Sequence, residues 1–154
     1  SAKLDSGLAL GKIGQVVTYT DTNNTTTTST SYTDVSSGGV SITPSSTSSK
    51  IIMSFQTHYV EIGGGGDDSG ATFAFKRGSS FIYNGGADSV DTRNFYIRSN
   101  GATSLELGFQ PFMHFIDSPS SSSSVTYTVH AKCDNGGSIS LSRPKYITLM
   151  EVLA

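Results

Sequence analysis

Histidine is the first side chain to examine, because a nucleophile in a catalytic site needs a nearby base and a group that orients it. The three histidines, His58, His114 and His130, each sit in an alternating stretch on the side that carries polar residues. Serine is so frequent that a Ser-His-Asp set could be drawn by chance, and no Gly-x-Ser-x-Gly motif is present. We therefore expect neither enzymatic activity nor a cofactor.

The glycine-rich stretch 63–69 contains the only short acidic cluster that could hold a cation, Asp67-Asp68-Ser69. Calcium takes about six to eight oxygen ligands, so two adjacent carboxylates favour a solvated turn over a metal site. Cys133 is the only cysteine, which excludes an intrachain disulfide and a structural zinc site. It is either a reactive thiol or, as we expect, a small apolar residue at the end of a strand. No metal site is predicted.

The charge balance narrows the possible partners. The formal net charge is −2 and only 14% of the 154 residues are charged, so no basic patch is available to neutralise nucleic-acid phosphates or to bind an anionic membrane. No apolar run approaches the roughly 18 residues of a membrane span. Ser, Thr, Gly and Asn supply the polarity instead, and these residues suit strands and turns better than helices.

A period-two alternation of apolar and polar residues runs through most of the chain and predicts strands. The clearest example, residues 50–60, places Ile51, Met53, Phe55, Thr57 and Tyr59 on one face and Ile52, Ser54, Gln56, His58 and Val60 on the other. About eight to ten such segments, separated by turn residues, are typical of a β-sandwich or barrel. We expect residues 12–154 to form one antiparallel domain, with residues 1–11 as a linker or the end of a fibre shaft.

Several sequence segments, in this order, resemble a domain that is common in tail-fibre and other structural proteins of marine bacteriophages. They are KIGQVV at 12–17, TSTSYTDV at 28–35, VSITPSSTSSKII at 40–52, DSP at 117–119, VTYTV at 125–129 and ITLMEV at 147–152. Together they extend over residues 12–152. The resemblance implies an all-β jelly-roll β-sandwich like those of tumour necrosis factor and C1q, located in the virion and assembled as a homotrimer with other virion proteins as partners.

Apolar side chains fall on both faces of the predicted strands, as Phe109 does relative to Phe112 and Phe115. One core cannot hold them all, and surplus apolar area on a sheet often marks an interface. The alternative is that Pro111 introduces a bulge that turns these aromatic rings toward one core. The candidate interface residues for a homotrimer are Tyr59, Phe109 and Tyr127.

The function favoured by the resemblance is the receptor-binding tip of a tail fibre, which contacts a host surface glycan or protein through its loops. The candidate ligand-binding residues are Asp67 and Asp68 in the glycine-rich loop, and Tyr83, on whose ring a sugar could stack. Two alternatives remain open. One is a virion component that binds no receptor, such as a capsid fibre, collar or decoration protein, and the other is a C1q-like lectin.

Overall fold

The structure is a computed structural model that describes residues 12–63, 70–84, 105–134 and 137–153. These residues form strands and turns, and no helix occurs among them. Accordingly, no described segment is a helix long and apolar enough to cross a membrane. The strands are β1 (Lys12–Asp21), β2 (Thr25–Thr27), β3 (Thr33–Asp34), β4 (Val40–Ile42), β5 (Lys50–Gly63), β6 (Gly70–Arg77), β7 (Ser80–Asn84), β8 (Leu105–Phe109), β9 (Phe112–Asp117), β10 (Val125–Asp134) and β11 (Ser138–Leu153).

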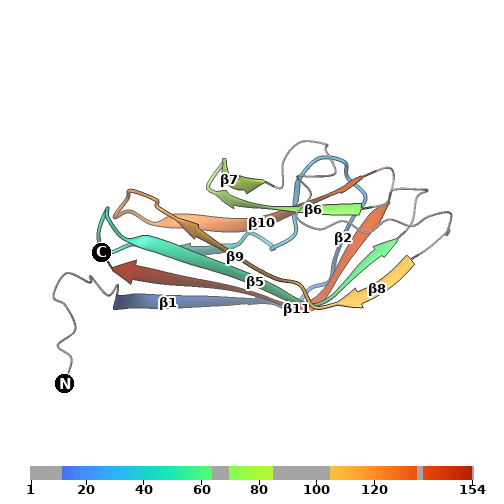
Figure 1. The fold of residues 1–154 in the computed structure, drawn as a ribbon, viewed down its shortest axis with the longest axis horizontal. Coiled ribbons are helices and arrows are strands. Elements are labelled where there is room, and N and C mark those ends of the chain that lie inside the picture. The colour runs from blue at the N-terminus through green and yellow to red at the C-terminus, as the bar shows by residue number, and fades with distance from the viewer. Residues whose placement is uncertain (1–11, 64–69, 85–104, 135–136, 154) are drawn as a thin grey trace, which may run out of the picture.

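The strands build two antiparallel sheets that lie face to face (Figure 1). The first sheet has the order β1-β11-β5-β8, with β9 also paired to β5 and β2 to β11. The second has the order β3-β10-β6-β7, with β4 also paired to β10. From β4 onward the chain changes sheet at each connection except two, β6–β7 in the second sheet and β8–β9 in the first, as expected of a jelly roll. The predicted all-β jelly-roll sandwich is therefore confirmed.

The core lies between the sheets and is filled by alternate residues of the long strands. β10 contributes its odd-numbered positions from Tyr127 to Cys133, and β6 contributes Phe73 and Phe75. Phe55 of the first sheet meets Phe73 of the second with ring centroids 6.3 Å apart. The predicted place of Cys133 as a small apolar residue at a strand end is thus confirmed, because it is 1% exposed within this core.

The first sheet bends where β5 and β11 pass a bulge, and Figure 1 shows both strands changing direction there, with β8 beside the last part of β5. Tyr59 pairs with Ser142 and Thr57 with Lys145, so two residues of β11 oppose one of β5 at this point. The inward face of β5 changes parity here, because Thr57 and Val60 are both fully buried. Our prediction that Val60 faces away from Phe55 was wrong. The bulge lies in the partner strand, and the sequence of β5 does not reveal it.

Two short turns fix the remaining connections that matter for the surfaces below. Gln110 and Pro111 separate β8 from β9, as expected of a proline that cannot donate a ladder hydrogen bond. Gly39 turns the chain into β4 with φ of 78°. A Cβ atom at Gly39 would lie 2.1 Å from the carbonyl oxygen of Tyr127, so the backbone of β10 requires glycine here.

Candidate functional site

The solvent side of the β1-β11-β5-β9 sheet, which we call the outer face, carries side chains arranged in rows across four strands. Ile116 of β9 pairs with Ile52 of β5, Ile52 with Met150 of β11, and Met150 with Val16 of β1. Side chains of directly paired residues lie about 4.5–5.5 Å apart between Cβ atoms. These four residues therefore form a continuous apolar row across the sheet.

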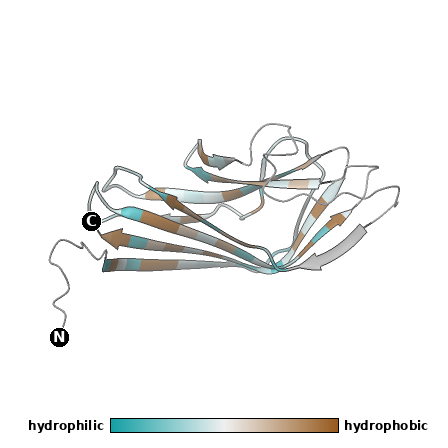
Figure 2. Cartoon of the chain, viewed as in Figure 1, coloured by the Kyte–Doolittle hydropathy of each residue, from teal (hydrophilic) through white to brown (hydrophobic). Residues whose placement is uncertain are grey.

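Large apolar side chains remain exposed on this face. Ile116 is 55% exposed and Val16 54%, at the two ends of the apolar row. Phe112, which lies two rows away along β9, is the most exposed large apolar residue described, at 65%. Figure 2 shows apolar residues gathered on β1, β5, β9 and β11 toward the end nearest the C terminus. Single exposed apolar residues are ordinary, but a contiguous set on one sheet marks a candidate interaction surface.

The second row of the outer face is polar, and the third contains both aromatic and polar side chains. His114 pairs with Ser54, Ser54 with Thr148, and Thr148 with Thr18, whose hydroxyl lies 3.4 Å from that of Thr148. The third row runs from Phe112 through Gln56 and Tyr146 to Thr20. His58 and His114 are exposed and His130 is half-buried on the solvent side of β10, which confirms their predicted placement outside the core.

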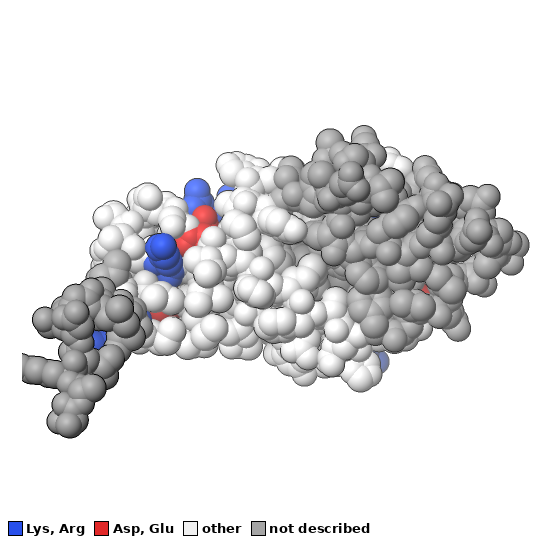
Figure 3. Space-filling view, viewed as in Figure 1, with Lys and Arg blue, Asp and Glu red and all other residues white. Residues whose placement is uncertain are grey.

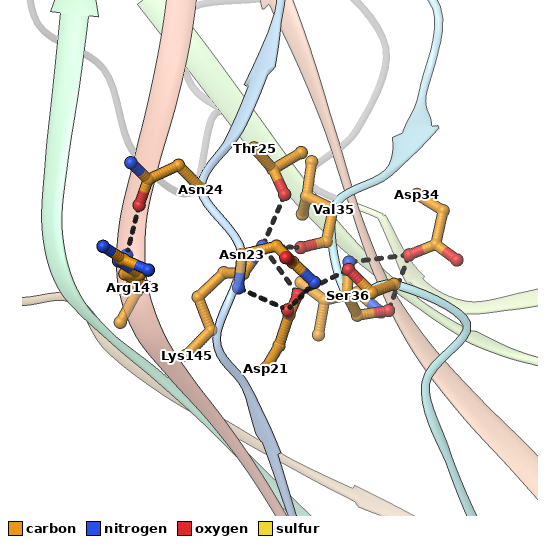
Figure 4. A network of polar contacts seen from close by, with 12 residues as sticks. Asp21, Asn23, Asn24, Thr25, Asp34, Val35, Ser36, Arg143 and Lys145 are labelled. Atoms are coloured by element: carbon orange, nitrogen blue, oxygen red, sulfur yellow. Dashed lines mark hydrogen bonds and ion pairs between the residues drawn. The ribbon is translucent and has the colours of Figure 1, made fainter.

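A buried ion pair holds β1 against β11 at one end of this surface (Figure 4). Lys145 Nζ lies 2.8 Å from Asp21 Oδ2, and both side chains are almost completely buried. The ammonium also donates to the hydroxyl of Thr25 and, at 3.0 Å, to the carbonyl oxygen of Val35. Its three donors are thus all used. A charged pair in the core is tolerable only when its hydrogen bonds are satisfied in this way.

The Asp21 carboxylate has further donors that keep it ionised. Ser37 donates to Oδ2 at 2.6 Å, and the backbone N–H of Asn23 donates to Oδ1 at 2.9 Å. Burial alone would raise the pKa of Asp21, but the hydrogen bonds from Lys145, Ser37 and Asn23 outweigh it and lower the pKa to about 2. The Asp21 carboxylate is therefore ionised throughout the neutral pH range.

A second buried carboxylate anchors the opposite end of the β1–β11 pair. Glu151 of β11 is 1% exposed and accepts hydrogen bonds from the backbone N–H and the hydroxyl of Ser45, each at 2.7 Å, and from Gln15 Nε2, also at 2.7 Å. Burial favours a raised pKa for Glu151, but the Ser45 and Gln15 hydrogen bonds prevail and lower it to about 2. Glu151 thereby joins β1, β11 and the loop after β4.

A third polar group joins the two sheets at the end of β9. Arg77 Nη1 of β6 lies 3.0 and 2.8 Å from the two oxygens of Asp117, and the hydroxyl of Tyr127 donates to Asp117 Oδ2 at 2.7 Å. Burial and the neighbouring Asp117 carboxylate raise the pKa of Tyr127. Tyr127 is 0% exposed, so our prediction that it belongs to a subunit interface was wrong. Its even-numbered neighbours on β10 face outward, and Tyr127 itself faces the core.

Of the other predicted site residues, the structure describes the side chains of Tyr59 and Tyr83. Tyr59 is half-buried at the bend of β5. Phe109 ends β8 and pairs with Val60, and its side chain lies outside the described residues, as do Asp67 and Asp68. Tyr83 of β7 is 39% exposed, and its ring packs on Phe115 of β9 at 5.6 Å, at the edge of the sandwich. The two whose side chains are described, Tyr59 and Tyr83, belong to different sheets.

Charged side chains are few among the described residues on the face drawn in Figure 3. Most of those visible there form one small group of both signs, toward the end where β1 begins and β11 ends. Among the described residues, no group of three His, Cys, Asp or Glu side chains is placed to hold a metal ion. The outer face rows were not found from sequence, because Ile116, Ile52, Met150 and Val16 come from four strands whose relative register the sequence does not give. Their only sequence signal is apolar residues at positions predicted to face away from the core.

No protein-family model matches the chain, and no curated protein matches it either. Among solved structures it is similar to the VP2 subviral particle of infectious bursal disease virus, with 14% identity over 92% of this chain and 38% of that chain and a TM-score of 0.35. The Gt strain of the same virus gives 14% identity, coverage of 100% and 42%, and a TM-score of 0.31. The chain thus spans about two fifths of these viral chains. Similarity at this level carries no argument about function.

Proposed function

We propose that this domain is a virion structural protein of a bacteriophage, that it assembles as a homotrimer through the outer face, and that it serves as the receptor-binding tip of a tail fibre. The observation that carries the assembly is the apolar row from Ile116 to Val16, which leaves two aliphatic residues more than half exposed. The phage assignment rests on the sequence segments within 12–52 and 117–152 that resemble a domain of marine bacteriophage structural proteins.

The size of the outer face fits a shared interface. Taking about 3.4 Å per residue and about 4.8 Å per strand, the face between Lys50 and His58 covers roughly 500 Å². A standard stable interface buries about 800 Å² on each partner. The face therefore supplies most of one such patch, and strand edges or loops beside it supply the rest of the surface that a subunit with two neighbours buries. In a closed ring each copy meets two neighbours, so the exposed apolar surface is covered without leaving a free patch.

The assembly is tested with Ile116→Asp, and Ser41→Asp is the matched control because it places the same charge on an exposed strand position of the other sheet. In light scattering at micromolar concentration we expect the parent and Ser41→Asp at three times the 16.2 kDa chain mass. Ile116→Asp should be a folded particle of one chain, because a buried unpaired carboxylate is costly. A parent protein at 16.2 kDa, or a trimeric Ile116→Asp, would contradict the proposal.

The receptor role is tested separately, by adsorption of fluorescently labelled protein to a panel of marine bacterial cells. Trimeric binding gains avidity of about 10²–10⁴ over a single site, so the parent should adsorb to at least one cell type and Ile116→Asp much more weakly. A trimer that adsorbs to none of the cells and does not reduce phage adsorption would favour the alternative, a capsid fibre, collar or decoration protein.

A further inference from the structure

The solvent side of the second sheet carries a group of aromatic rings and lysines that no role above has used. We call it the ring–lysine cluster, and it consists of Tyr32, Lys76, Phe81, His130 and Lys132. Tyr32 and Phe81 have ring centroids 5.2 Å apart, and the His130 ring meets Phe81 edge-on at 6.2 Å. The cluster lies on the sheet opposite the outer face, so the proposed trimer does not cover it with that face.

Strand register explains why these side chains meet. β10 turns its odd-numbered residues into the core, which leaves His130 and Lys132 on the solvent side. Lys76 of β6 pairs with Thr128 of β10 on one side and with Phe81 of β7 on the other. Tyr32 directly precedes β3, which pairs with β10 at positions 130 and 131. Four of the five members therefore lie on the paired strands β6, β7 and β10, and Tyr32 lies next to β3.

Phe81 is the centre of the cluster and is still 42% exposed. Lys76 Nζ sits 4.3 Å from the Phe81 ring centroid, and Lys132 Nζ sits 5.5 Å from that of Tyr32. Cation–π contacts of this kind hold an ammonium in place without neutralising it. The result is an exposed apolar ring with a positioned positive charge beside it.

The Lys76 ammonium differs from the other positioned cations of the protein. Lys145 and Arg77 both lie 2.8 Å from a carboxylate. In the described part of the chain, Lys76 Nζ has no carboxylate oxygen within 4.0 Å. An anion brought by a ligand could therefore approach this ammonium without displacing a described acidic partner.

Polar groups suited to hydroxyls flank the charge. His130 Nε2 lies 3.0 Å from the hydroxyl of Thr128. Burial and the nearby positive charge of Lys76 lower the pKa of His130, so its ring is neutral at pH 7. Nδ1 of this ring is buried, so Nε2 and the Thr128 hydroxyl are the polar groups that a ligand hydroxyl would meet. The cluster thus combines one exposed apolar ring, one ammonium and a neutral imidazole within a single patch.

We propose that the ring–lysine cluster binds an acidic saccharide, with the sugar's carboxylate on Lys76, its C–H face on Phe81 and its hydroxyls toward His130 and Thr128. This names a ligand class for the proposed receptor role and rests on that role. Nucleic acid would also bring anions and stacking rings, but it is disfavoured by the net charge of −2. Lys132 adds positive charge at the rim of the same patch.

The test is calorimetric binding of a panel of uronic and sialic acid oligosaccharides to the full chain, each compared with its methyl ester, which keeps the sugar and removes the charge. We expect at least one acid to bind, the ester to bind about tenfold or more weakly, and affinity to fall with added salt, because a charge-assisted contact is lost. Inorganic phosphate alone should bind poorly, since it offers no C–H face to Phe81.

Variants assign the site. Lys76→Met and Phe81→Leu should each weaken acid binding about tenfold while the protein stays folded and trimeric, and Lys12→Met should bind like the parent because this exposed lysine lies on the other sheet. No binding to any acid, equal binding of acid and ester, or unchanged affinity in both cluster variants would each overturn the proposal. If no acidic saccharide binds but the protein still adsorbs to cells, the saccharide proposal is wrong and the receptor role is unaffected. If a saccharide binds but the protein adsorbs to no cells, only the receptor role is contradicted.

Discussion

Replacing Lys145 by methionine isolates the contribution of the buried Asp21–Lys145 pair. Methionine keeps most of the length of the lysine side chain and its apolar stem, and it removes the ammonium that lies 2.8 Å from Asp21 Oδ2 and 3.0 Å from the carbonyl oxygen of Val35. Asp21 would retain Ser37 and the N–H of Asn23 as donors, but it would be a buried charge without a counterion.

The expected loss is large for a domain of this size. Removing one partner of a buried ion pair costs about 3–5 kcal/mol, which is a major share of the roughly 5–15 kcal/mol that stabilises a typical domain. The double variant Asp21→Asn/Lys145→Met removes both charges, so it should lose less than Lys145→Met alone. This order follows because the cost lies in the unpaired charge and not in the missing attraction.

The assay is urea unfolding at a fixed chain concentration, followed by circular dichroism at pH 7 and pH 3. In the parent, the pKa of Asp21 is about 2 when folded and 3.8 in its ordinary state, so the stability it supplies is present above pH 4 and is lost as the pH falls toward 2. In Lys145→Met burial raises the pKa of Asp21, and protonation relieves the variant in acid. The gap between the two proteins should therefore narrow from pH 7 to pH 3. A loss below about 1 kcal/mol at pH 7, or a gap that does not change with pH, would refute this reasoning.

Two further variants test the packing around the sheets. Glu151→Gln should flatten the fall in stability between about pH 4.5 and pH 2, because the pKa of Glu151 is about 2 in the folded protein and 4.5 ordinarily, so its contribution disappears over that range. The urea midpoint measured as a function of acid pH tests this, and an unchanged pH dependence would exclude Glu151 as a source. Gly39→Ala should cost at least about 2 kcal/mol of unfolding free energy, because φ is 78° and the new Cβ would meet the Tyr127 carbonyl oxygen. Gly38→Ala is the control, because its Cβ meets no atom within 4 Å and it measures the cost of the positive φ alone. Equal urea midpoints for the two variants would contradict the clash.

Much of the fold follows from the sequence because the period of two is a local signal. In β10 each odd residue from Tyr127 to Cys133 is apolar and is buried, as the alternation predicts. The signal fails where a partner strand intervenes. The bulge of β11 at 143–144 reverses the inward parity of β5 after Thr57, and nothing in residues 50–60 records it.

The buried charges were missed for a related reason. A glutamate between Met150 and Val152 indicates an outward position, yet Glu151 points into the protein. Its donors Ser45 and Gln15 are 106 and 136 residues away in the chain. Only the tertiary fold brings these donors to the carboxylate, so local sequence does not show that burial of Glu151 is compensated by hydrogen bonds.

These buried charges also bear on the surface, because strand register decides which side chains stand in one row. β1 is an edge strand of the first sheet, held mainly by its pairing with β11. The Asp21–Lys145 pair fixes one end of that pairing, and the Gln15–Glu151 hydrogen bond fixes the other. A slip of β1 by two residues would separate these partners and move Val16 away from Met150, which would shorten the apolar row by one strand. The polar groups inside the sandwich therefore set the geometry of the apolar face outside it. For the same reason, a variant that breaks the internal pair should be judged by its assembly as well as by its stability.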